Sequence, residues 1–295
     1  MTVTGLSVTV RCHAKLNLGL EVVRRRADGY HDLVTLFHSV SLADTLQVGL
    51  GGDEVTVVCD CEAPSGTGNI CYRAAQAFRA AEGVEAGVAL RLEKAIPVGG
   101  GMGGGSADAA GALLALQQLT GKGTAESLRH LAAGLGADVP YFLVGGTCLG
   151  RGVGDQLAPV PVPCTLWFVL CRPDLAVDTA HAYRWLNAAD FSTGGATERL
   201  ARALSEGDLA RAGSLLQNAF FPHLCATKPV YLALESSLLQ AGALGASLTG
   251  SGACVFGLFA DQEAAEGARE ALPPSAVWSA VACSAQPAVE VCRGD

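Results

Sequence analysis

The segment KAIPVGGGMGGGSADAA, residues 94–110, holds six glycines within the seven positions 99–105. Glycine loses more conformational entropy on folding than any other residue, so this run is costly unless bare backbone is needed there. A helix is predicted to follow at once, from Ser106 to Leu119, and Gly121 is predicted to end it. The first N–H groups of a helix lack intrahelical partners and lie at the positive end of its dipole. The segment therefore predicts a loop that brings backbone N–H groups against a phosphate.

The common nucleotide-binding motifs explain this loop less well. Gly99, Gly101 and Gly104 satisfy G-x-G-x-x-G, but such a match is nearly automatic in so glycine-rich a run, and no clear acidic ribose partner follows at the expected distance. The Walker pattern and the protein-kinase signatures are absent. A flexible loop or a close helix crossing stays open as an alternative. Ser106 occupies the expected N-cap position, where its hydroxyl could also lie beside phosphate or Mg²⁺, and Asp108 is expected to compensate the helix dipole.

Composition limits the class of protein. The chain has 295 residues, half of them hydrophobic and 16% charged, which is typical of a folded protein with room for two domains. A net charge of −8 argues against a general nucleic-acid or membrane surface. No apolar run reaches the ~18 residues of a membrane helix, and no signal peptide is evident. The eleven cysteines are scattered, so we expect reduced, structural thiols in a cytoplasmic protein.

Periodicity predicts a mixture of strands and helices. Strands are expected at residues 6–23, 44–50, 54–60, 87–97, 164–170, 245–260 and 276–285, and helices at 69–81 and 124–136. The composition changes at APVPVP, residues 158–163, which predicts one domain over residues 1–160 and a second over 161–295. The order of elements favours an α+β fold over a doubly wound βαβ sheet.

Two further motifs lie near the N-terminus. In AKLNLGL, Lys15 and Asn17 are two residues apart, so on a strand they share a face and need polar partners if buried. Alone, such a lysine is more often at the surface. The basic run at residues 24–26 is expected to be a solvated loop. In RADGYH, Tyr30 and His31 follow a turn, which favours a binding loop over core packing.

Two more motifs lie later in the chain. Asp138 in LGADVPYFLVGG stands after a helix and before Pro140, where it could be a loop residue or a cap. LTGSGACVF places a second glycine-bearing turn before an apolar strand.

Three of these segments, AKLNLGL, PVGGGMGGGSADAA and LTGSGACVF, stand in the order and positions typical of the GHMP kinases, which the chain resembles over nearly its whole length. RADGYHDLVTLFHSVSLAD and GADVPYFLVGG resemble the branch that acts on cytidine diphosphate methylerythritol. The resemblance implies an N-terminal domain like ribosomal protein S5 domain 2, a ferredoxin-like C-terminal domain and substrates in the cleft between them. It also implies that ATP donates its γ-phosphoryl group to the 2-hydroxyl of that acceptor, in the non-mevalonate route to isoprenoid precursors.

Other functions stay open at this point. A different GHMP kinase, acting on homoserine or mevalonate, is disfavoured by RADGYH. A non-catalytic nucleotide-binding protein of the same fold is disfavoured because Lys15 and Asp138 are both present. A nicotinamide-dependent oxidoreductase is a distant third.

The resemblance also implies roles for individual residues. Lys15 and Asp138 would be catalytic, and Mg²⁺ would bind near Ser106. Tyr30 and Tyr183 would sandwich the cytosine, and His31 would distinguish cytosine from uracil. ATP would be bound by Asn69, Pro97, Gly99, Gly100, Gly101, Gly103, Gly104, Gly105 and Ser106, and the acceptor by Asn17, Tyr30, His31, Thr179, Tyr183, Gly250, Ser251 and Gly252. The chain departs from the family at Met102, usually leucine, and at Ala107, where a second hydroxyl often follows Ser106.

Overall fold

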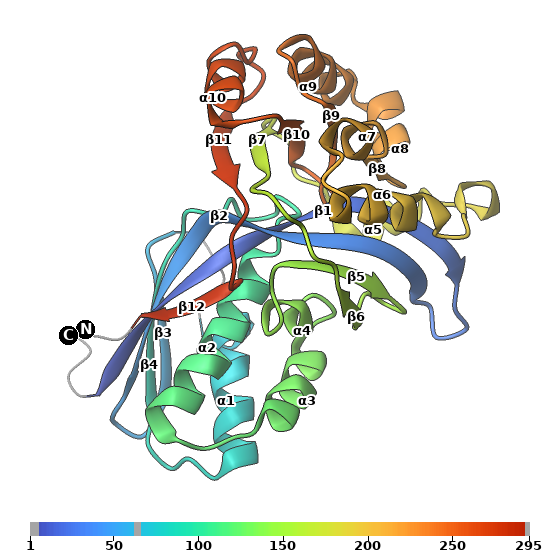
Figure 1. Ribbon diagram of the computed structural model, residues 1–295. Helices are drawn as coiled ribbons and strands as arrows, with labels where there is room; N and C mark the ends of the chain where they lie inside the picture. The colour runs from blue at the N-terminus through green and yellow to red at the C-terminus, as the bar shows by residue number, and fades with distance from the viewer. Residues whose placement is uncertain (1–5, 62–65, 293–295) are drawn as a thin grey trace.

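The computed structural model describes residues 6–61 and 66–292, and it contains two β-sheets with helices packed against them (Figure 1). The strands are β1 (Ser7–Arg25), β2 (His31–Leu50), β3 (Val55–Cys59), β4 (Val88–Glu93), β5 (Thr147–Arg151), β6 (Gln156–Pro159), β7 (Trp167–Arg172), β8 (Gln217–Asn218), β9 (Gly245–Leu248), β10 (Val255–Phe259), β11 (Trp278–Cys283) and β12 (Val289–Cys292). The helices are α1 (Ile70–Glu82), α2 (Gly104–Thr120), α3 (Ala125–Leu135), α4 (Val139–Phe142), α5 (Thr179–Tyr183), α6 (Gly195–Ser205), α7 (Leu209–Ser214), α8 (Phe221–Thr227), α9 (Pro229–Gln240) and α10 (Gln262–Glu270), with 3₁₀ turns η1 (Gly66–Gly68) and η2 (Ala188–Asp190).

The long antiparallel pair β1 and β2 forms the frame of the first sheet, whose order is β12-β1-β2-β4-β3. The expected strand at residues 6–23 is confirmed, and it continues to Arg25, so the interpretation of residues 24–26 as a loop was wrong for its first two members. Arg24 and Arg25 pair with Asp32 and His31 across the hairpin. Strand pairing therefore continues to the tip of the hairpin, where it fixes the position of His31.

Helix α2 lies under the first sheet and fixes the position of the glycine loop. It begins at Gly104, after Gly103 in a left-handed conformation with φ of 71°. The expectation that Ser106 is the N-cap was therefore wrong, because a backbone turn at Gly103 starts the helix and leaves Ser106 inside its first turn. Gly121 ends the helix as predicted, with φ of 65°. A Cβ at Gly111 would lie 2.5 Å from the Cys12 sulfur, so only glycine lets the helix approach the sheet this closely.

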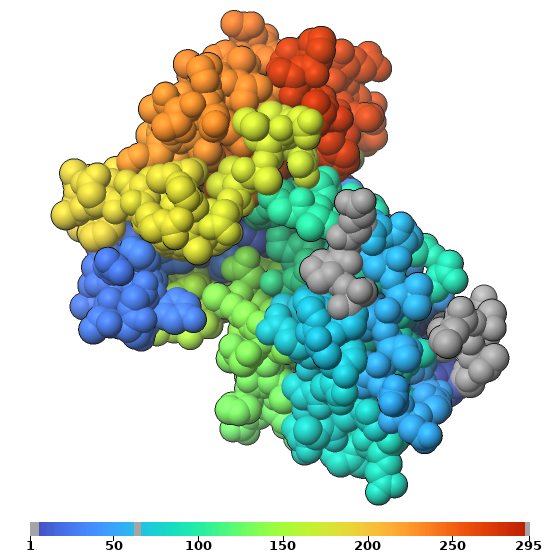
Figure 2. Space-filling view, turned by 180° about the vertical axis from the view of Figure 1, so that it is seen from behind, coloured from blue at the N-terminus to red at the C-terminus, as the bar shows by residue number. Residues whose placement is uncertain are grey.

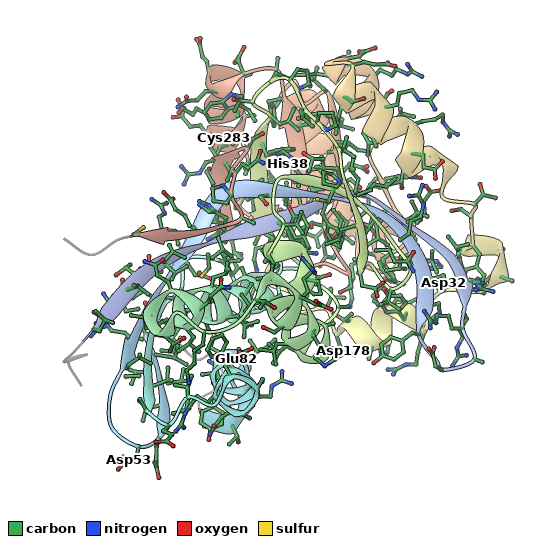
Figure 3. All side chains as sticks on the ribbon, turned by 60° about the horizontal axis from the view of Figure 1, so that its bottom comes forward. Asp32, His38, Asp53, Glu82, Asp178 and Cys283 are labelled. Atoms are coloured by element: carbon green, nitrogen blue, oxygen red, sulfur yellow. The ribbon has the colours of Figure 1, made fainter. Side chains whose placement is uncertain are left out.

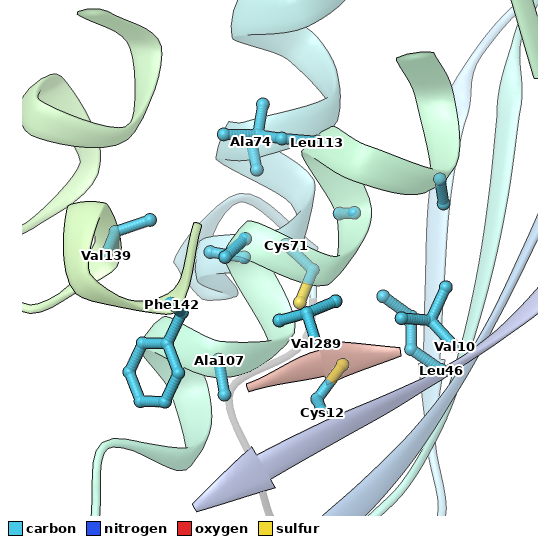
Figure 4. Packing of buried hydrophobic residues seen from close by; sticks show 14 of the residues in the cluster. Val10, Cys12, Leu46, Cys71, Ala74, Ala107, Leu113, Val139, Phe142 and Val289 are labelled. Carbon is cyan, nitrogen blue, oxygen red and sulfur yellow. The ribbon is translucent and has the colours of Figure 1, made fainter. Parts of the chain in front are cut away.

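The core beneath the first sheet is built from elements far apart in the sequence. Cys12 of β1, Cys71 of α1, Ala107 of α2 and Val289 of β12 are fully or almost fully buried in one cluster (Figure 4). Ala107 thus has a packing role where the family often carries a hydroxyl. Burial of this apolar surface is the main driving force for assembling the layer.

The second sheet has the order β11-β7-β10-β9, and its strands all follow residue 160 in the chain. A second cluster joins the sheets, because it contains Leu16 and Leu36 of the first together with Phe168 and Phe256 of the second. The composition change at residues 158–163 begins in the last two residues of β6 and continues into the link to β7, and we propose the boundary after residue 160 as the point where the chain first leaves the first sheet. Strands β8 and β12 later return to pair with β1. Over the described ranges, no helix is long and apolar enough to cross a membrane.

Candidate active site

Two cavities meet at the glycine loop. The larger, of about 880 Å³, extends from this loop to the tip of the β1–β2 hairpin, and the smaller, of about 400 Å³, lies between the loop and the start of α1. Gly101, Gly103 and Ser106 line both. The two cavities therefore adjoin at these residues, which form a shared glycine wall, and a group bound in one cavity lies next to a group bound in the other.

The glycines are needed for this wall. Gly99, Gly101 and Gly103 have φ of 72°, 75° and 71°, a left-handed region that other residues rarely adopt. A Cβ on Gly101 would lie 2.3 Å from the Thr249 carbonyl oxygen and 2.7 Å from that of Gly252. The segment LTGSGACVF thus packs directly against the first glycine run, which has room for it only because Gly101 has no side chain. The segments are also bonded, because the N–H groups of Ala253 and Cys254 donate to the Gly99 and Gly100 carbonyls at 3.3 and 3.2 Å.

The residues expected to bind ATP all line the smaller cavity. They are Asn69, Pro97, Gly99, Gly100, Gly101, Gly103, Gly104, Gly105 and Ser106. Asn69 is also the N-cap of α1, where its side chain accepts a hydrogen bond from the Cys71 N–H at 2.8 Å. Met102 is buried in the core cluster that joins the two sheets, so its apolar side chain packs beneath the loop.

A buried charge cluster at the base of the smaller cavity was missed from the sequence. The Lys94 ammonium donates to the carboxylates of Asp44 and Asp108, the latter at 2.6 Å. Asp108 was expected to compensate the helix dipole, and that was wrong: it is 1% exposed and ion-paired with Lys94. Burial raises the pKa of Asp108 against the opposing charge of Lys94, and the two carboxylates raise the pKa of Lys94. Lys94 is therefore a cation at neutral pH.

The two residues expected to be catalytic lie side by side in the larger cavity. The Lys15 ammonium is 3.3 Å from the Asp138 carboxylate and donates to the Asn17 amide oxygen at 2.5 Å. The prediction that Lys15 and Asn17 share a face is confirmed. The Lys15 side chain is 4% exposed and that of Asp138 35%, so the lysine is held by its surroundings and the carboxylate is open to the cavity. Asp138 directly precedes the short helix α4 and makes no side-chain capping bond.

Asn17 joins the Lys15–Asp138 pair to the second glycine turn. Its amide oxygen accepts from the Gly250 N–H at 3.0 Å, and its amide nitrogen donates to the Thr35 hydroxyl at 2.8 Å. The Ser251 and Thr179 hydroxyls are 2.8 Å apart. Asn17, Thr179, Gly250 and Ser251 all line the larger cavity, whereas Gly252 lines neither of the two. Both polar atoms of the buried Asn17 amide are thus hydrogen-bonded, which fixes its orientation.

Three rings gather at the far end of the larger cavity. Tyr30, His31 and Tyr183 all line it, and the His31 and Tyr183 rings stack with centroids 4.8 Å apart and planes at 22°. Tyr30 is 65% exposed. Burial and the charge of Arg25 lower the pKa of His31, so its imidazole is neutral at neutral pH. Burial and the negative charge of Asp138 raise the pKa of Tyr183 to about 12, so it stays a phenol.

Two phenylalanines that support this end were missed from the sequence. Phe191 meets the His31 ring edge-on at 6.3 Å, and Phe220 meets Tyr183 at 4.9 Å. Both line the larger cavity. Neither stands in a motif, so no local signal could have separated them from ordinary core residues.

Comparison with known proteins agrees with this geometry. Residues 69–146 match the family model described as GHMP kinases N terminal domain, and residues 200–277 match GHMP kinases C terminal. The chain is 42% identical over 263 residues to the 4-diphosphocytidyl-2-C-methyl-D-erythritol kinase of Pelotomaculum thermopropionicum, covering 88% of this chain and 91% of the relative. It is 38% identical over 282 residues to the enzyme of that name from Geobacter metallireducens, covering 95% and 99%.

Solved structures give the same result. A crystal structure of 4-(cytidine 5'-diphospho)-2C-methyl-D-erythritol kinase superimposes with a TM-score of 0.83 at 36% identity, covering 94% of this chain and 99% of the other. Homoserine kinase from Cytophaga hutchinsonii shares the fold, with a TM-score of 0.80 at 24% identity. The α+β, two-domain expectation is confirmed, and the chain belongs to the GHMP kinases, in the family of 4-diphosphocytidyl-2-C-methyl-D-erythritol kinases.

Proposed function

We propose that this chain transfers the γ-phosphoryl group of ATP to the 2-hydroxyl of 4-diphosphocytidyl-2-C-methyl-D-erythritol. The observation that carries the proposal is the position of the Lys15–Asp138 pair, 3.3 Å apart, in a cavity that shares the glycine wall with the smaller one. ATP bound in the smaller cavity would direct its terminal phosphate toward that wall. The acceptor hydroxyl would lie against Lys15 and Asp138, within reach of the phosphate.

Phosphoryl transfer needs in-line positioning and neutralisation of charge more than covalent help from the protein. Lys15 supplies a fixed positive charge, and Asp138 accepts the hydroxyl proton. The bond from the hydroxyl oxygen to the γ-phosphorus forms as the bond from that phosphorus to the β–γ bridging oxygen breaks. ADP leaves with the bridging oxygen. The N–H groups at the start of α2 stabilise phosphate charge without adding a cation.

The residues around the wall suit Mg²⁺, which prefers oxygen ligands. Ser106 lines both cavities, and its hydroxyl makes no hydrogen bond with any residue the structure describes. One carboxylate oxygen of Asp108, a residue lining the smaller cavity, is buried and unpaired over the same residues. Ser106 would hold the ion, which supplies further neutralisation of phosphate charge when bound.

Base recognition would take place at the ring end of the larger cavity. Tyr30 and Tyr183 offer aromatic faces to the cytosine. His31 is neutral and therefore carries one donor and one acceptor. If His31 donates to the cytosine ring nitrogen, uracil would present an N–H there, and two donors would face each other. Sites built for one hydrogen-bond pattern reject a mismatched analogue strongly, because buried polar groups are left unpaired.

The test is ADP release with ATP and Mg²⁺ against a panel of the cytidine diphosphate acceptor, its uridine analogue, homoserine and mevalonate. We expect turnover with the cytidine acceptor and a large preference over the uridine analogue, and His31→Ala should narrow that preference. Turnover with homoserine or mevalonate alone would assign the chain to another GHMP activity. The eleven free cysteines fit the reducing cytoplasm, where we place the reaction.

A further inference from the structure

Among the described residues that line the larger cavity, cations outnumber acidic residues. The cations lining the cavity are Lys15, Arg25 and Arg184, and the acidic residue lining it is Asp138. Asp138 is already paired with Lys15 at 3.3 Å. Arg25 and Arg184 are therefore in excess, in a protein whose net charge is −8. A local charge opposite to that of the whole protein indicates a site for an anionic group.

Arg25 differs from its two neighbours in the basic run. Arg24 pairs with Asp32 at 2.5 Å, and Arg26 pairs with Asp28 at 3.1 Å. Arg25 has no hydrogen bond or ion pair with any of residues 6–61 or 66–292. Side chains alternate along a strand, so Arg25 projects from the opposite face, and it is the member of the run that lines the larger cavity. Two arginines of the hairpin are thus paired with aspartates of the same hairpin, whereas Arg25 lines the cavity.

Arg184 also lines the larger cavity, at the end of α5. It follows Tyr183, its guanidinium is 2.8 Å from a His181 ring nitrogen, and it makes no ion pair with any residue that the structure describes. His31 connects the two arginines: it is paired with Arg25 across β1 and β2 and stacks on Tyr183, the residue before Arg184. Figure 2 shows the hairpin, in blue, directly beside the segment that contains α5, in yellow.

We infer that Arg25 and Arg184, which both line the larger cavity beside the base-binding rings, form a subsite for the diphosphate of a cytidine diphosphate ligand. The inference rests on the proposed function, since it takes the rings as the base site and Lys15 and Asp138 as the phosphoryl-transfer site. A diphosphate that links the base to the reacting polyol must lie between those two ends. Guanidinium groups bind phosphate oxygens through paired, charge-assisted hydrogen bonds.

Calorimetric binding of CDP and of cytidine, without ATP or turnover, tests the subsite. Wild-type protein should bind CDP more tightly than cytidine. Because both arginines are exposed, we expect Arg25→Ala or Arg184→Ala to reduce CDP affinity by about fivefold to tenfold each, with cytidine affinity changed by less than about twofold. Wild-type CDP affinity should also fall as NaCl is raised, and this dependence should be weaker in the double variant.

Arg24→Ala is the matched control, because it removes an arginine from the same strand end that is paired with Asp32. It should leave the ratio of CDP to cytidine affinity unchanged, and melting curves should show that all variants fold. If the wild type binds both ligands and the double variant keeps the wild-type ratio, the subsite is wrong and the proposed function stands. If folded wild-type protein binds neither CDP nor cytidine, the base site of the proposed function fails and the subsite falls with it.

Discussion

The two cavities that share the glycine wall are built in different ways. The smaller is lined mostly by backbone and apolar residues from one stretch of chain, residues 92–108, with the start of α1. The larger is lined by charged and aromatic side chains from β1, β2, α5 and the residue before α4, together with the turn after β9. Backbone N–H groups recognise phosphate whatever carries it, whereas placed side chains distinguish one acceptor from another. Changes in the larger cavity should therefore alter the choice and reaction of the acceptor, and changes in the smaller should alter ATP affinity.

The largest expected effect comes from removing the carboxylate of Asp138, which we propose as the general base. Asp138→Asn keeps the shape of the side chain but cannot take the hydroxyl proton. General base catalysis contributes about 10²- to 10⁴-fold, so kcat should fall by that order while ATP affinity changes little. Steady-state kinetics and ATP calorimetry check this. Asp53→Asn, on an exposed loop remote from both cavities (Figure 3), is the control and should keep wild-type kinetics. Near-normal turnover in Asp138→Asn would remove this carboxylate from the mechanism.

The next effect concerns the frame that holds both cavities. His38 of β2 is buried. Its ring nitrogens lie 2.8 Å from the Thr147 hydroxyl and 3.0 Å from the Ser284 hydroxyl. Ser284 follows Cys283, the last residue of β11 (Figure 3). Burial lowers the pKa of His38 to about 4. The folded state binds fewer protons than the unfolded state, where a histidine has a pKa of about 6.5. Stability from this residue is therefore complete above about pH 6.5 and is lost as the pH falls toward 4, by about 3 kcal/mol in total.

Urea unfolding of wild type and His38→Gln at pH 7 and pH 5 checks this prediction. Over that interval the wild type should lose about 2 kcal/mol more than the variant. An identical pH dependence in the two proteins would show that His38 is not the group responsible.

A matched pair of glycine substitutions addresses the wall itself. Gly101→Ala places a Cβ 2.3 Å from the Thr249 carbonyl oxygen at a φ of 75°, whereas Gly105→Ala meets only Ile70, at 3.6 Å. Overpacking of this kind costs about 1–3 kcal/mol, so Gly101→Ala should lower ATP affinity roughly tenfold, and Gly105→Ala should leave it within about twofold. Calorimetry with ATP measures both. Equal affinities in two folded variants would show that this wall does not shape the phosphate site.

The smallest effect is expected at the ring end. Base–aromatic stacking is worth about 1–3 kcal/mol per base, so Tyr30→Ala should raise KM for the cytidine acceptor by roughly tenfold. KM for ATP should not change, because Tyr30 lines the larger cavity and not the smaller. Tyr72→Ala, on α1, offers a tyrosine control outside the larger cavity. If Tyr30→Ala raised both KM values equally, its role would be structural and the separation of the two cavities would fail.

The sequence alone determined the features that depend on near neighbours. The glycine run predicted the loop before α2, strand alternation put Lys15 and Asn17 on one face, and Gly121 marked the helix end. These signals are reliable because φ preferences and the two periodicities act within a few residues. The order of the motifs, through the family resemblance, also supplied Asp138, Tyr30 and Tyr183 as site residues, and both cavities are lined by the residues proposed for them, apart from Gly252.

Only the tertiary structure decided the features that depend on distant partners. Lys94 lies between Asp44 and Asp108, Thr249 closes on Gly101, and β12 returns to β1 from the far end of the chain. The identity of a residue does not state which remote group will neutralise it. Arg24, Arg25 and Arg26 are alike in sequence, yet the fold gives acidic partners to the first and third and leaves the second facing the cavity. Packing brings such groups together because it buries apolar surface shared by segments far apart in sequence, and charge pairing then follows the geometry that packing sets.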